Sequence, residues 1–503
     1  MNTDGWGGLQ VYASSVTEYA GTTYALALDV EGRRVLCVRG VATGFEGEPR
    51  DEILVAPLSA ANATEMRCRL PWLTPVPLGL ATSAGTGDRL GLATPGHIHA
   101  VRAVGGIQPI LAQQSMRENA RTGRTPQEVV DDACWGILQV GWRDPWGADA
   151  DHLKSTDDID ICVAAGYTFF TIDPGDHVDN AAHTDDLATL REKYLALPWD
   201  RLRDLPDAMR ARYVGRRQVV EDLTLVFDEE ALLRAACKYG GALAHTAEMY
   251  AHLVDRTRPQ SHATPHDCHP EATEGSQTSH SAPAFELEVS VDETETPTSP
   301  LEHVFIASEL TRLGVRWVSL APRYVGRFEK GVDYIGDLDV FQTEFAKHAA
   351  IARVLGPYKL SIHSGSDKFS IYPLMAAETR RMAHLKTAGT SYLEALRAIA
   401  GVDPALFCEI LSLAIERYDE DRATYHVSAD AGKVPAPETL ADDELAGVLD
   451  LFDGREVLHV TFGSVLDMYG ARLRSVLDEN EGAHYAALEA HFVRHLVPFA
   501  EEA

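Results

Sequence analysis

Short apolar runs alternate with longer stretches of helical periodicity along the middle of this 503-residue chain. Alternation of this kind indicates a parallel sheet in which a helix connects each strand to the next. Eight apolar runs predict strands, at residues 88–96, 108–115, 146–154, 167–175, 284–294, 316–323, 358–365 and 383–390. Eight strand–helix units in one direction predict a (β/α)8 barrel of the TIM type.

The segments outside this pattern predict three additions to a barrel at residues 83–400. Residues 1–82 mix short β-rich runs with Gly and Pro turns, which predicts a small β-containing region. An insertion at 184–284 separates the fourth and fifth strands. Within it, residues 256–283 are rich in Pro, Ser, Thr and His and lack core-forming side chains, which predicts a disordered surface loop. Residues 401–503 are mostly amphipathic helix and predict a helical C-terminal extension.

The net charge and the N-terminal sequence limit the kinds of partner and the location that we expect for this chain. The formal net charge is −30, because 75 acidic residues stand against 45 basic ones. Such a balance repels phosphate backbones and anionic membrane surfaces, which argues against nucleic-acid and membrane partners. The N-terminus has neither the basic start nor the apolar segment of a signal peptide. We therefore predict a cytoplasmic protein with a small-molecule partner, and the sequence leaves a homo-oligomer open.

Polar and titratable side chains gather at the carboxyl ends of the predicted strands, where barrel enzymes carry their active residues. Two histidines at strand ends, His152 and His363, together with carboxylates suit an open divalent-metal site. Glu329, Glu288 and Asp292 are all candidates for the third ligand. For each of these carboxylates, a helix cap or an ion pair is the alternative role.

The fifth predicted strand alternates strictly between apolar and polar residues. Its pattern turns Glu288, Ser290 and Asp292 toward the barrel axis. Inward carboxylates are costly to bury without a partner, so a metal, a lysine or a substrate must accompany them. Glu288 and Asp292 are therefore acid–base candidates, and a buried pair with Lys386 or Arg323 is the alternative.

The chain lacks the motifs of the common cofactor and nucleophile sites. No GxGxxG follows a strand, and no GxxxxGK[ST], GxSxG or HExxH occurs. Nucleotide cofactors and serine-hydrolase chemistry are therefore poorly supported.

Several stretches between about residues 85 and 470 resemble one family. They include DRLGLATPGHIHA, PILAQQSMRENARTGRTPQEVVDDA, WGADADHLK, LAPRYVGRFEKGVDYIGD and KLSIHSGSDKFSIYP. The chain resembles the tagaturonate/fructuronate epimerases, which are metal-dependent sugar-acid epimerases. The resemblance implies interconversion of D-tagaturonate and D-fructuronate with a divalent cation (Zn, Mn, Ni, Co or Fe). It also implies activity of related enzymes on neutral ketohexoses such as fructose or tagatose.

The inverted carbinol of such a substrate lies β to the ketone, so the carbonyl does not assist direct proton abstraction at that carbon. We therefore predict retro-aldol cleavage to an enediolate held by the cation, rotation of the aldehyde fragment and re-addition. Asp151 and Glu288 are the predicted acid–base residues. The predicted metal ligands are His152, Glu329 and His363. The predicted substrate-binding residues are Gln113, Lys154, Asp292, Arg323, Ser364 and Lys368, of which Lys154, Arg323 and Lys368 are the anchors for the carboxylate.

The sequence is also compatible with two other enzymatic functions of the barrel. A metal-dependent aldolase would accumulate cleavage products without an epimer, and an aldose–ketose isomerase would form an aldose. A non-enzymatic alternative is a regulatory or partner subunit that retains the barrel. Tight binding of a divalent ion would favour an enzyme over such a subunit.

Overall fold

The computed structural model describes residues 6–258 and 285–500. The loop predicted as disordered, 256–283, lies outside the described residues except for its first three positions. Arg256, the first of them, is the last residue of a long helix.

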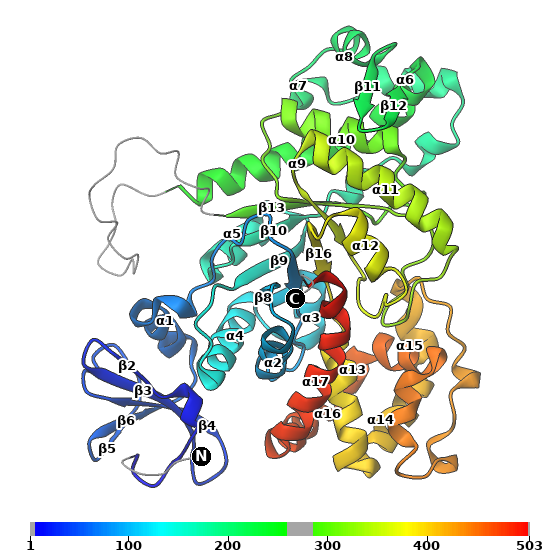
Figure 1. Ribbon diagram of the computed structural model, residues 1–503. Coiled ribbons are helices and arrows are strands. Elements are labelled where there is room, and N and C mark those ends of the chain that lie inside the picture. Colours follow the sequence, from blue (N-terminus) through cyan, green and yellow to red (C-terminus); the bar gives the residue numbers. More distant parts are fainter. Residues whose placement is uncertain (1–5, 259–284, 501–503) are drawn as a thin grey trace.

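Eight parallel strands close into a barrel at the centre of the molecule (Figure 1). In chain order they are β7 (Ser83–Gly85), β8 (Gln108–Ser115), β9 (Gly147–Leu153), β10 (Phe169–Ile172), β13 (Glu286–Val291), β14 (Ser319–Pro322), β15 (Lys359–Ile362) and β16 (Ala383–Lys386). Each strand pairs with the next in the chain, and β16 pairs with β7 to close the ring. The predicted TIM-type barrel is confirmed.

The first predicted strand, 88–96, is wrong. The first barrel strand is β7, three small residues that carry too little pattern to be recognised in the sequence. The predicted stretch instead forms a turn in which the Asp88 carboxylate accepts hydrogen bonds from the backbone N–H groups of Leu90, Gly91 and Ala93. Pro95 then opens a helix, where its fixed φ suits the first turn.

Helices surround the barrel, and residues that cap helices mark where several of them begin and end. Thr125 with Glu128 and Ser299 with Glu302 form capping boxes, and Gly141 ends its helix in a left-handed conformation. These helices are α2 (Thr94–Val104), α3 (Met116–Thr122), α4 (Pro126–Val140), α5 (Thr156–Ala165), α10 (Pro300–Arg312), α11 (Leu338–Leu355), α12 (Tyr372–Glu378) and α13 (Thr390–Val402).

An antiparallel sheet precedes the barrel and lies beside it with helix α1 (Ala60–Arg69) (Figure 1). Its strands are β1 (Gln10–Val11), β2 (Thr17–Tyr19), β3 (Thr22–Leu28), β4 (Arg34–Arg39), β5 (Glu48–Arg50) and β6 (Ile53–Ala56). One sheet face shares the large core with the barrel, through side chains such as Tyr24 and Leu36. The opposite face covers a small core around Trp6 and Ile53.

The insertion between β10 and β13 folds into helices and one hairpin. Its elements are α6 (Leu187–Leu195), α7 (Trp199–Leu202), α8 (Pro206–Tyr213), β11 (Arg217–Val220), β12 (Leu223–Val226) and α9 (Glu229–Arg256). Helix α9 packs against α10 and α5 and so joins the ring of helices around the barrel.

The C-terminal extension is helical, as the sequence predicts, and it folds back onto the barrel. Its helices are α14 (Pro404–Asp421), α15 (Phe452–Val460), α16 (Phe462–Glu479) and α17 (Glu481–Leu496). Helices α13 to α16 enclose a separate hydrophobic core. Helix α17 leaves that core and packs along α2, where Leu488 and Phe492 join the core of the barrel (Figure 1).

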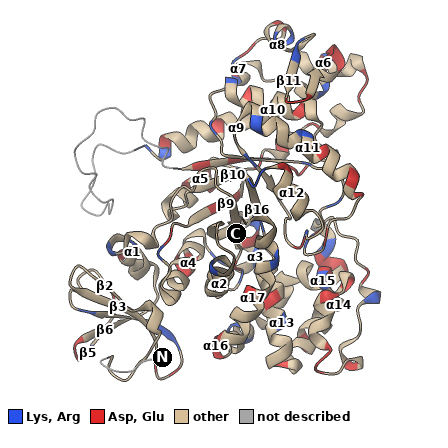
Figure 2. Ribbon diagram, viewed as in Figure 1, with Lys and Arg blue, Asp and Glu red and all other residues tan. Residues whose placement is uncertain are grey.

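Charged side chains are spread over the helices of the whole molecule, and acidic ones also enter the barrel strands (Figure 2). Among the described residues, no helix combines the length and apolar character needed to cross a membrane.

Candidate active site

One lysine holds three carboxylates together inside the barrel. The Nζ atom of Lys386, at the end of β16, lies 3.0 Å from Asp149 Oδ2, 2.6 Å from Asp151 Oδ1 and 2.9 Å from Glu288 Oε1. Only 3 % of Lys386 and none of Glu288 is exposed. Buried charges of this kind are tolerated only when each finds a partner. Glu288 thus faces inward as predicted, and of the two alternative partners, Lys386 and Arg323, it is Lys386 that pairs with it.

The charges in this cluster shift one another's ionisation. Burial alone would lower the pKa of Lys386, but the three carboxylates raise it well above its usual value, so the amine stays protonated. Burial alone would raise the pKa of Glu288, but Lys386 and His363 hold it well below its usual value. Burial outweighs Lys386 at Asp149 and raises the pKa of that carboxyl to about 7. Glu288 is therefore ionised at neutral pH.

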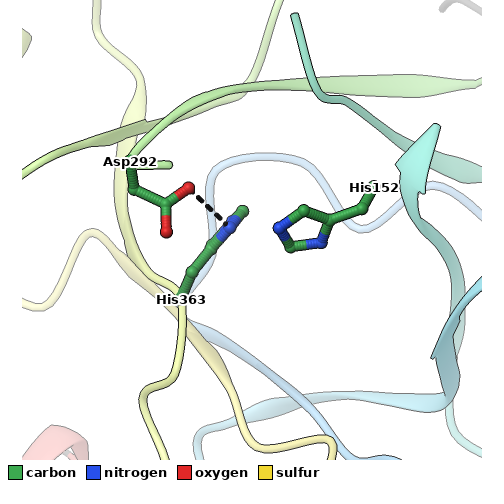
Figure 3. Close-up of side chains that lie close together, drawn as sticks. All are labelled: His152, Asp292 and His363. Carbon is green, nitrogen blue, oxygen red and sulfur yellow. Dashed lines mark ion pairs between the residues drawn. The ribbon is translucent and has the colours of Figure 1, made fainter. Parts of the chain in front are cut away.

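His363 stands directly after β15, between two carboxylates. Its Nε2 atom lies 2.6 Å from Glu288 Oε1, and its Nδ1 atom lies 3.1 Å from Asp292 Oδ1. Burial lowers the pKa of His363, but these two acidic groups overcome that effect and raise it to about 10. The deeper carboxylate, Glu288, fixes the ring and leaves Nδ1 facing Asp292 (Figure 3).

A bulge in β9 explains how two adjacent residues both reach the site. Between the pairs Ala150–Phe170 and Leu153–Ile172, strand β9 has one residue more than β10, and His152 has a φ of +55°. Such an extra residue redirects side chains that would otherwise point to opposite faces. Asp151 therefore contacts Lys386, while the His152 ring lies 4.8 Å from the His363 ring, centroid to centroid.

His152, Asp292 and His363 form a group that fits a metal ion. Their ligand atoms all lie within 4.8 Å of one another, and the side chains point toward one another (Figure 3). His152 Nδ1 is buried and lies 2.8 Å from Asp151 Oδ1, but among the described residues no hydrogen bond to it meets the usual geometry. Two imidazoles and one carboxylate are a donor set typical of first-row divalent ions with open positions for a substrate.

A cavity that is open to solvent lies over this end of the barrel. Of the predicted site residues, Gln113, Asp151, His152, His363 and Ser364 line it. The sequence assigned no specific role to the rest of the lining apart from Lys386: Arg89, Ser115, Arg117, Glu118, Lys330, Ser366, Ala388, Gly389, Tyr425 and His459.

Glu329 does not join the histidine pair, contrary to the prediction. Its carboxylate accepts hydrogen bonds from the backbone N–H of Ser428 at 2.9 Å and from its hydroxyl at 2.7 Å, and it pairs with Arg327 at 3.2 Å. It therefore ties the loop after β14 to the C-terminal extension. Asp292, one of the three candidates for the third ligand and also a predicted substrate-binding residue, lies beside the two histidines instead.

The three predicted carboxylate anchors lie outside the cavity lining. The Lys368 amine is fully buried and donates to the backbone carbonyls of Glu329, Val332 and Ser366. Lys154 is half exposed and pairs with Asp176 at 3.1 Å and with Asp173 at 3.6 Å. The backbone N–H of Arg323 donates to the Thr298 hydroxyl at 3.1 Å, and Arg323 is not among the residues that line the cavity. Lys154 and Lys368 therefore bind groups of loops that lie outside the cavity lining.

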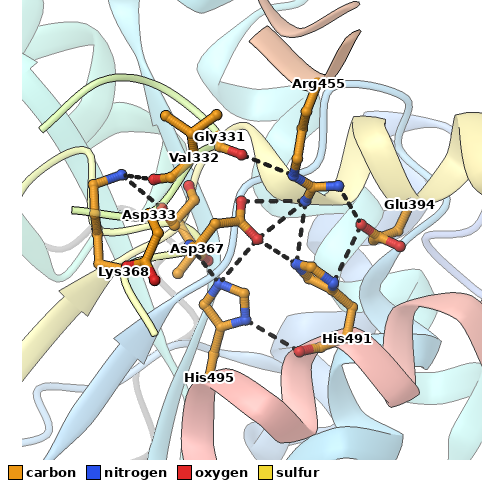
Figure 4. A network of polar contacts seen from close by, with 12 residues as sticks. Gly331, Val332, Asp333, Asp367, Lys368, Glu394, Arg455, His491 and His495 are labelled. Carbon is orange, nitrogen blue, oxygen red and sulfur yellow. Dashed lines mark hydrogen bonds and ion pairs between the residues drawn. The ribbon is translucent and has the colours of Figure 1, made fainter. Parts of the chain in front are cut away.

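The turn after His363 is held from outside the barrel by a buried polar network (Figure 4). Arg455, on α15, lies 3.1 Å from one carboxylate oxygen of Asp367 and 3.2 Å from the other, and 3.0 Å from Glu394. His491 Nε2, on α17, lies 2.6 Å from the same Asp367 carboxylate. The backbone N–H of Asp367 donates to His495 Nε2 at 2.9 Å.

Asp367, His491 and His495 have ligand atoms close enough for a metal, but the network already uses them. The Arg455 guanidinium lies 3.2 Å from His491 Nε2, where it would repel a cation. Burial lowers the pKa of His495 to about 3, so this ring is neutral and its Nε2 accepts the Asp367 N–H. We interpret the cluster as the anchor of a turn that carries the cavity residues Ser364 and Ser366.

The fold and the cavity define an enzyme of the TIM-barrel class whose site takes a small polar molecule. The sequence pattern of the tagaturonate epimerase family matches residues 12–262 and 272–498. A tagaturonate/fructuronate epimerase from Thermotoga maritima is 41 % identical, covering 97 % of this chain and 96 % of that protein. The chain belongs to the tagaturonate epimerase family.

Solved structures agree with this assignment. The glycerol-complexed fructuronate-tagaturonate epimerase from Cohnella laeviribosi is 34 % identical, with a TM-score of 0.88 over 98 % of this chain and 97 % of that one. The native form of the same enzyme gives a TM-score of 0.87, again with 98 % and 97 % covered. The similarity therefore includes the N-terminal sheet and the C-terminal helices as well as the barrel.

Proposed function

We propose that this protein interconverts D-tagaturonate and D-fructuronate in the cavity over the barrel, with a divalent cation held by His152, Asp292 and His363. The observation that carries the activity is the 41 % identity to a tagaturonate/fructuronate epimerase over almost the whole of both chains. The donor set at the barrel rim supports the cation. When bound, the cation supplies Lewis acidity to the hydroxyl and carbonyl oxygens beside it.

Glu288 and Lys386 support the site from beneath. Glu288 accepts a hydrogen bond from His363 Nε2, which fixes the ring so that Nδ1 faces Asp292. Because Glu288 is fully buried behind that ring, we assign it a positioning role rather than the predicted contact with substrate. Lys386 lines the cavity as a permanent cation beside Asp151 and can donate a hydrogen bond to a substrate oxygen.

We assign Asp151 the exchange of the hydroxyl proton. It lines the cavity, and although burial alone would raise its pKa, His152 and Lys386 hold that pKa well below the usual value. In the proposed retro-aldol route, Asp151 takes the proton of the carbinol hydroxyl as the bond to the carbon α to the ketone breaks. The bonding electron pair enters the enediolate, the aldehyde fragment turns over, and the bond re-forms on its other face with return of a proton to oxygen.

The activity is tested with tagaturonate and fructose side by side, in a coupled assay of chelated and metal-supplemented protein. We expect epimerisation of the hexuronate, about one divalent ion per chain by elemental analysis, and loss of turnover after chelation that the added ion restores. Full turnover in thoroughly chelated protein would eliminate the metal site. Accumulation of cleavage products without an epimer would favour an aldolase instead.

The route is tested by running the reaction in deuterated water. Retro-aldol cleavage moves protons only between oxygen atoms, so we expect the product to carry no deuterium at a skeletal carbon. Mass spectrometry and proton NMR of the isolated product measure this directly. One deuterium per turnover on carbon would replace the retro-aldol route by direct proton exchange.

A further inference from the structure

Besides Lys386, the cavity lining carries three cations, two from loops and one from the start of a helix; with Glu118 and His459 we call them the cavity wall. Arg89 lies between β7 and α2, Arg117 lies at the start of α3, and Lys330 lies between β14 and α11. No salt bridge within residues 6–258 and 285–500 joins Arg117 or Lys330 to an acidic side chain, and Glu118, the one carboxylate of this wall, is bound by Arg89. The wall therefore has an excess of positive charge in a protein of net charge −30.

Two neighbouring side chains hold Arg89 in place and leave one nitrogen atom of its guanidinium available as a hydrogen-bond donor. Its Nε and Nη2 atoms lie 3.1 Å and 2.6 Å from Glu118 Oε1, and its guanidinium lies 3.7 Å from the centre of the Phe462 ring. Only 3 % of the residue is exposed, yet Nη1 has no hydrogen-bond partner within the described part of the chain. A buried donor of this kind is costly unless an acceptor reaches it, and this residue lines the cavity.

The neighbours of Arg89 point to an anionic acceptor. Burial lowers the pKa of Lys330, and the charge of Arg117 lowers it further, so the two cations repel each other across the cavity wall. His459 belongs to the same wall, and its Nδ1 atom has no hydrogen-bond partner in the parts of the chain that the structure describes. Burial, together with Arg89 and Lys330, holds the pKa of His459 well below the usual value. A neutral imidazole beside three cations leaves the attraction for an anion undiminished.

We propose that Arg89, Arg117 and Lys330 bind the carboxylate of the substrate and so make the enzyme prefer hexuronates over neutral ketohexoses. This assignment rests on the proposed function and replaces Lys154, Arg323 and Lys368 as the anchors. The arrangement suits the substrate, because its carboxylate meets the cations while its hydroxyl and carbonyl groups lie toward His152, Asp292 and His363. A guanidinium held on one side by Glu118 presents its free edge to a carboxylate in a fixed direction.

The test compares Lys330→Met and Arg117→Met with the wild type on tagaturonate and on tagatose. Charge-assisted hydrogen bonds lost at such a site cost about tenfold to a hundredfold in affinity. We therefore expect each variant to lower the ratio of kcat/KM for tagaturonate to that for tagatose by about that factor, mainly through KM. Lys433→Met, an exposed lysine of the C-terminal extension, is the matched control and should leave the ratio unchanged.

A binding measurement makes the result independent of turnover. Calorimetric titration with D-gluconate and with the neutral D-glucitol compares two open-chain probes that differ in the carboxylate. We expect the wild type to prefer the acid and Lys330→Met to lose that preference. Equal losses for the charged and the neutral compound, in turnover and in binding, would overturn the carboxylate site. A wild type that binds gluconate but epimerises no hexuronate would instead contradict the proposed function.

Discussion

Lys386→Met is expected to lower the free energy of unfolding by about 3–5 kcal/mol, the cost of leaving a buried charge without its partner. The substitution keeps the volume of the side chain but removes the cation that lies within 3.0 Å of Asp149, Asp151 and Glu288. Epimerase activity should fall with stability, because Asp151 and the Glu288–His363 pair lose their common support. Urea unfolding measures the first effect, and the assay measures the second.

Lys359→Met is the matched control for this prediction. Lys359 is fully buried on the neighbouring strand β15, but it donates to the Ser83 hydroxyl at 2.9 Å and forms no ion pair among the described residues. Because no carboxylate among the described residues forms an ion pair with Lys359, we expect a smaller destabilisation than for Lys386→Met. Equal losses in the two variants would show that buried volume, and not charge pairing, determines the effect.

The destabilisation of Lys386→Met should also depend on pH. Without the ammonium group, the pKa values of the three carboxyls rise above their unfolded values, and the protonated forms become the stable ones in the folded state. Stability then falls as pH rises through those raised values. The difference between variant and wild type should therefore narrow from pH 7 toward pH 5. A difference that stays constant over this interval would contradict the assignment.

Arg455→Met is expected to lower the free energy of unfolding by about 3–5 kcal/mol for the same reason, because it leaves buried charges without their partner. The guanidinium forms ion pairs with two buried carboxylates, Asp367 and Glu394. It also donates to the Gly331 carbonyl at 2.8 Å and so joins the loop after β14 to the C-terminal helices. Because the turn that carries Ser364 and Ser366 is anchored through Asp367, KM for the hexuronate should rise as well.

Arg397→Met removes the more exposed of the two arginines that contact Glu394. Its Nε atom lies 2.8 Å from Glu394 Oε2, and a quarter of its side chain is exposed. Because Glu394 keeps its ion pair with Arg455, we expect a smaller loss of stability than for Arg455→Met and an unchanged KM. A variant Arg455→Met with normal KM would show that the network stabilises the fold without positioning the turn.

Local sequence patterns predicted most of the barrel and part of its chemistry. Seven of the eight predicted strand positions overlap barrel strands, and Glu288 faces inward, because a strand buried on one face must alternate. The places of His152 and His363 followed from the rule that barrel residues at strand ends converge. These features depend on spacing along one strand, which a sequence displays directly.

The corrected assignments all involve partners far away in the sequence. The Lys368 amine donates hydrogen bonds to carbonyls of the loop after β14, and the Glu329 carboxylate accepts one from Ser428 of the C-terminal extension. Both side chains have the right chemistry for a site, and only their long-range neighbours show that they stabilise loops. The first strand was misplaced because β7 has only three small residues.

The sequence by itself determined the barrel, the inward carboxylate of the fifth strand, the histidines at the rim and the resemblance to sugar-acid epimerases. Only the tertiary structure decided that Asp292 completes the histidine pair, that Glu288 lies behind His363, and that the cations of the cavity wall are Arg89, Arg117 and Lys330. The physical reason is that periodicity fixes which face of an element is buried. Which charges meet depends on loop closure and on the helices that fold back over the barrel.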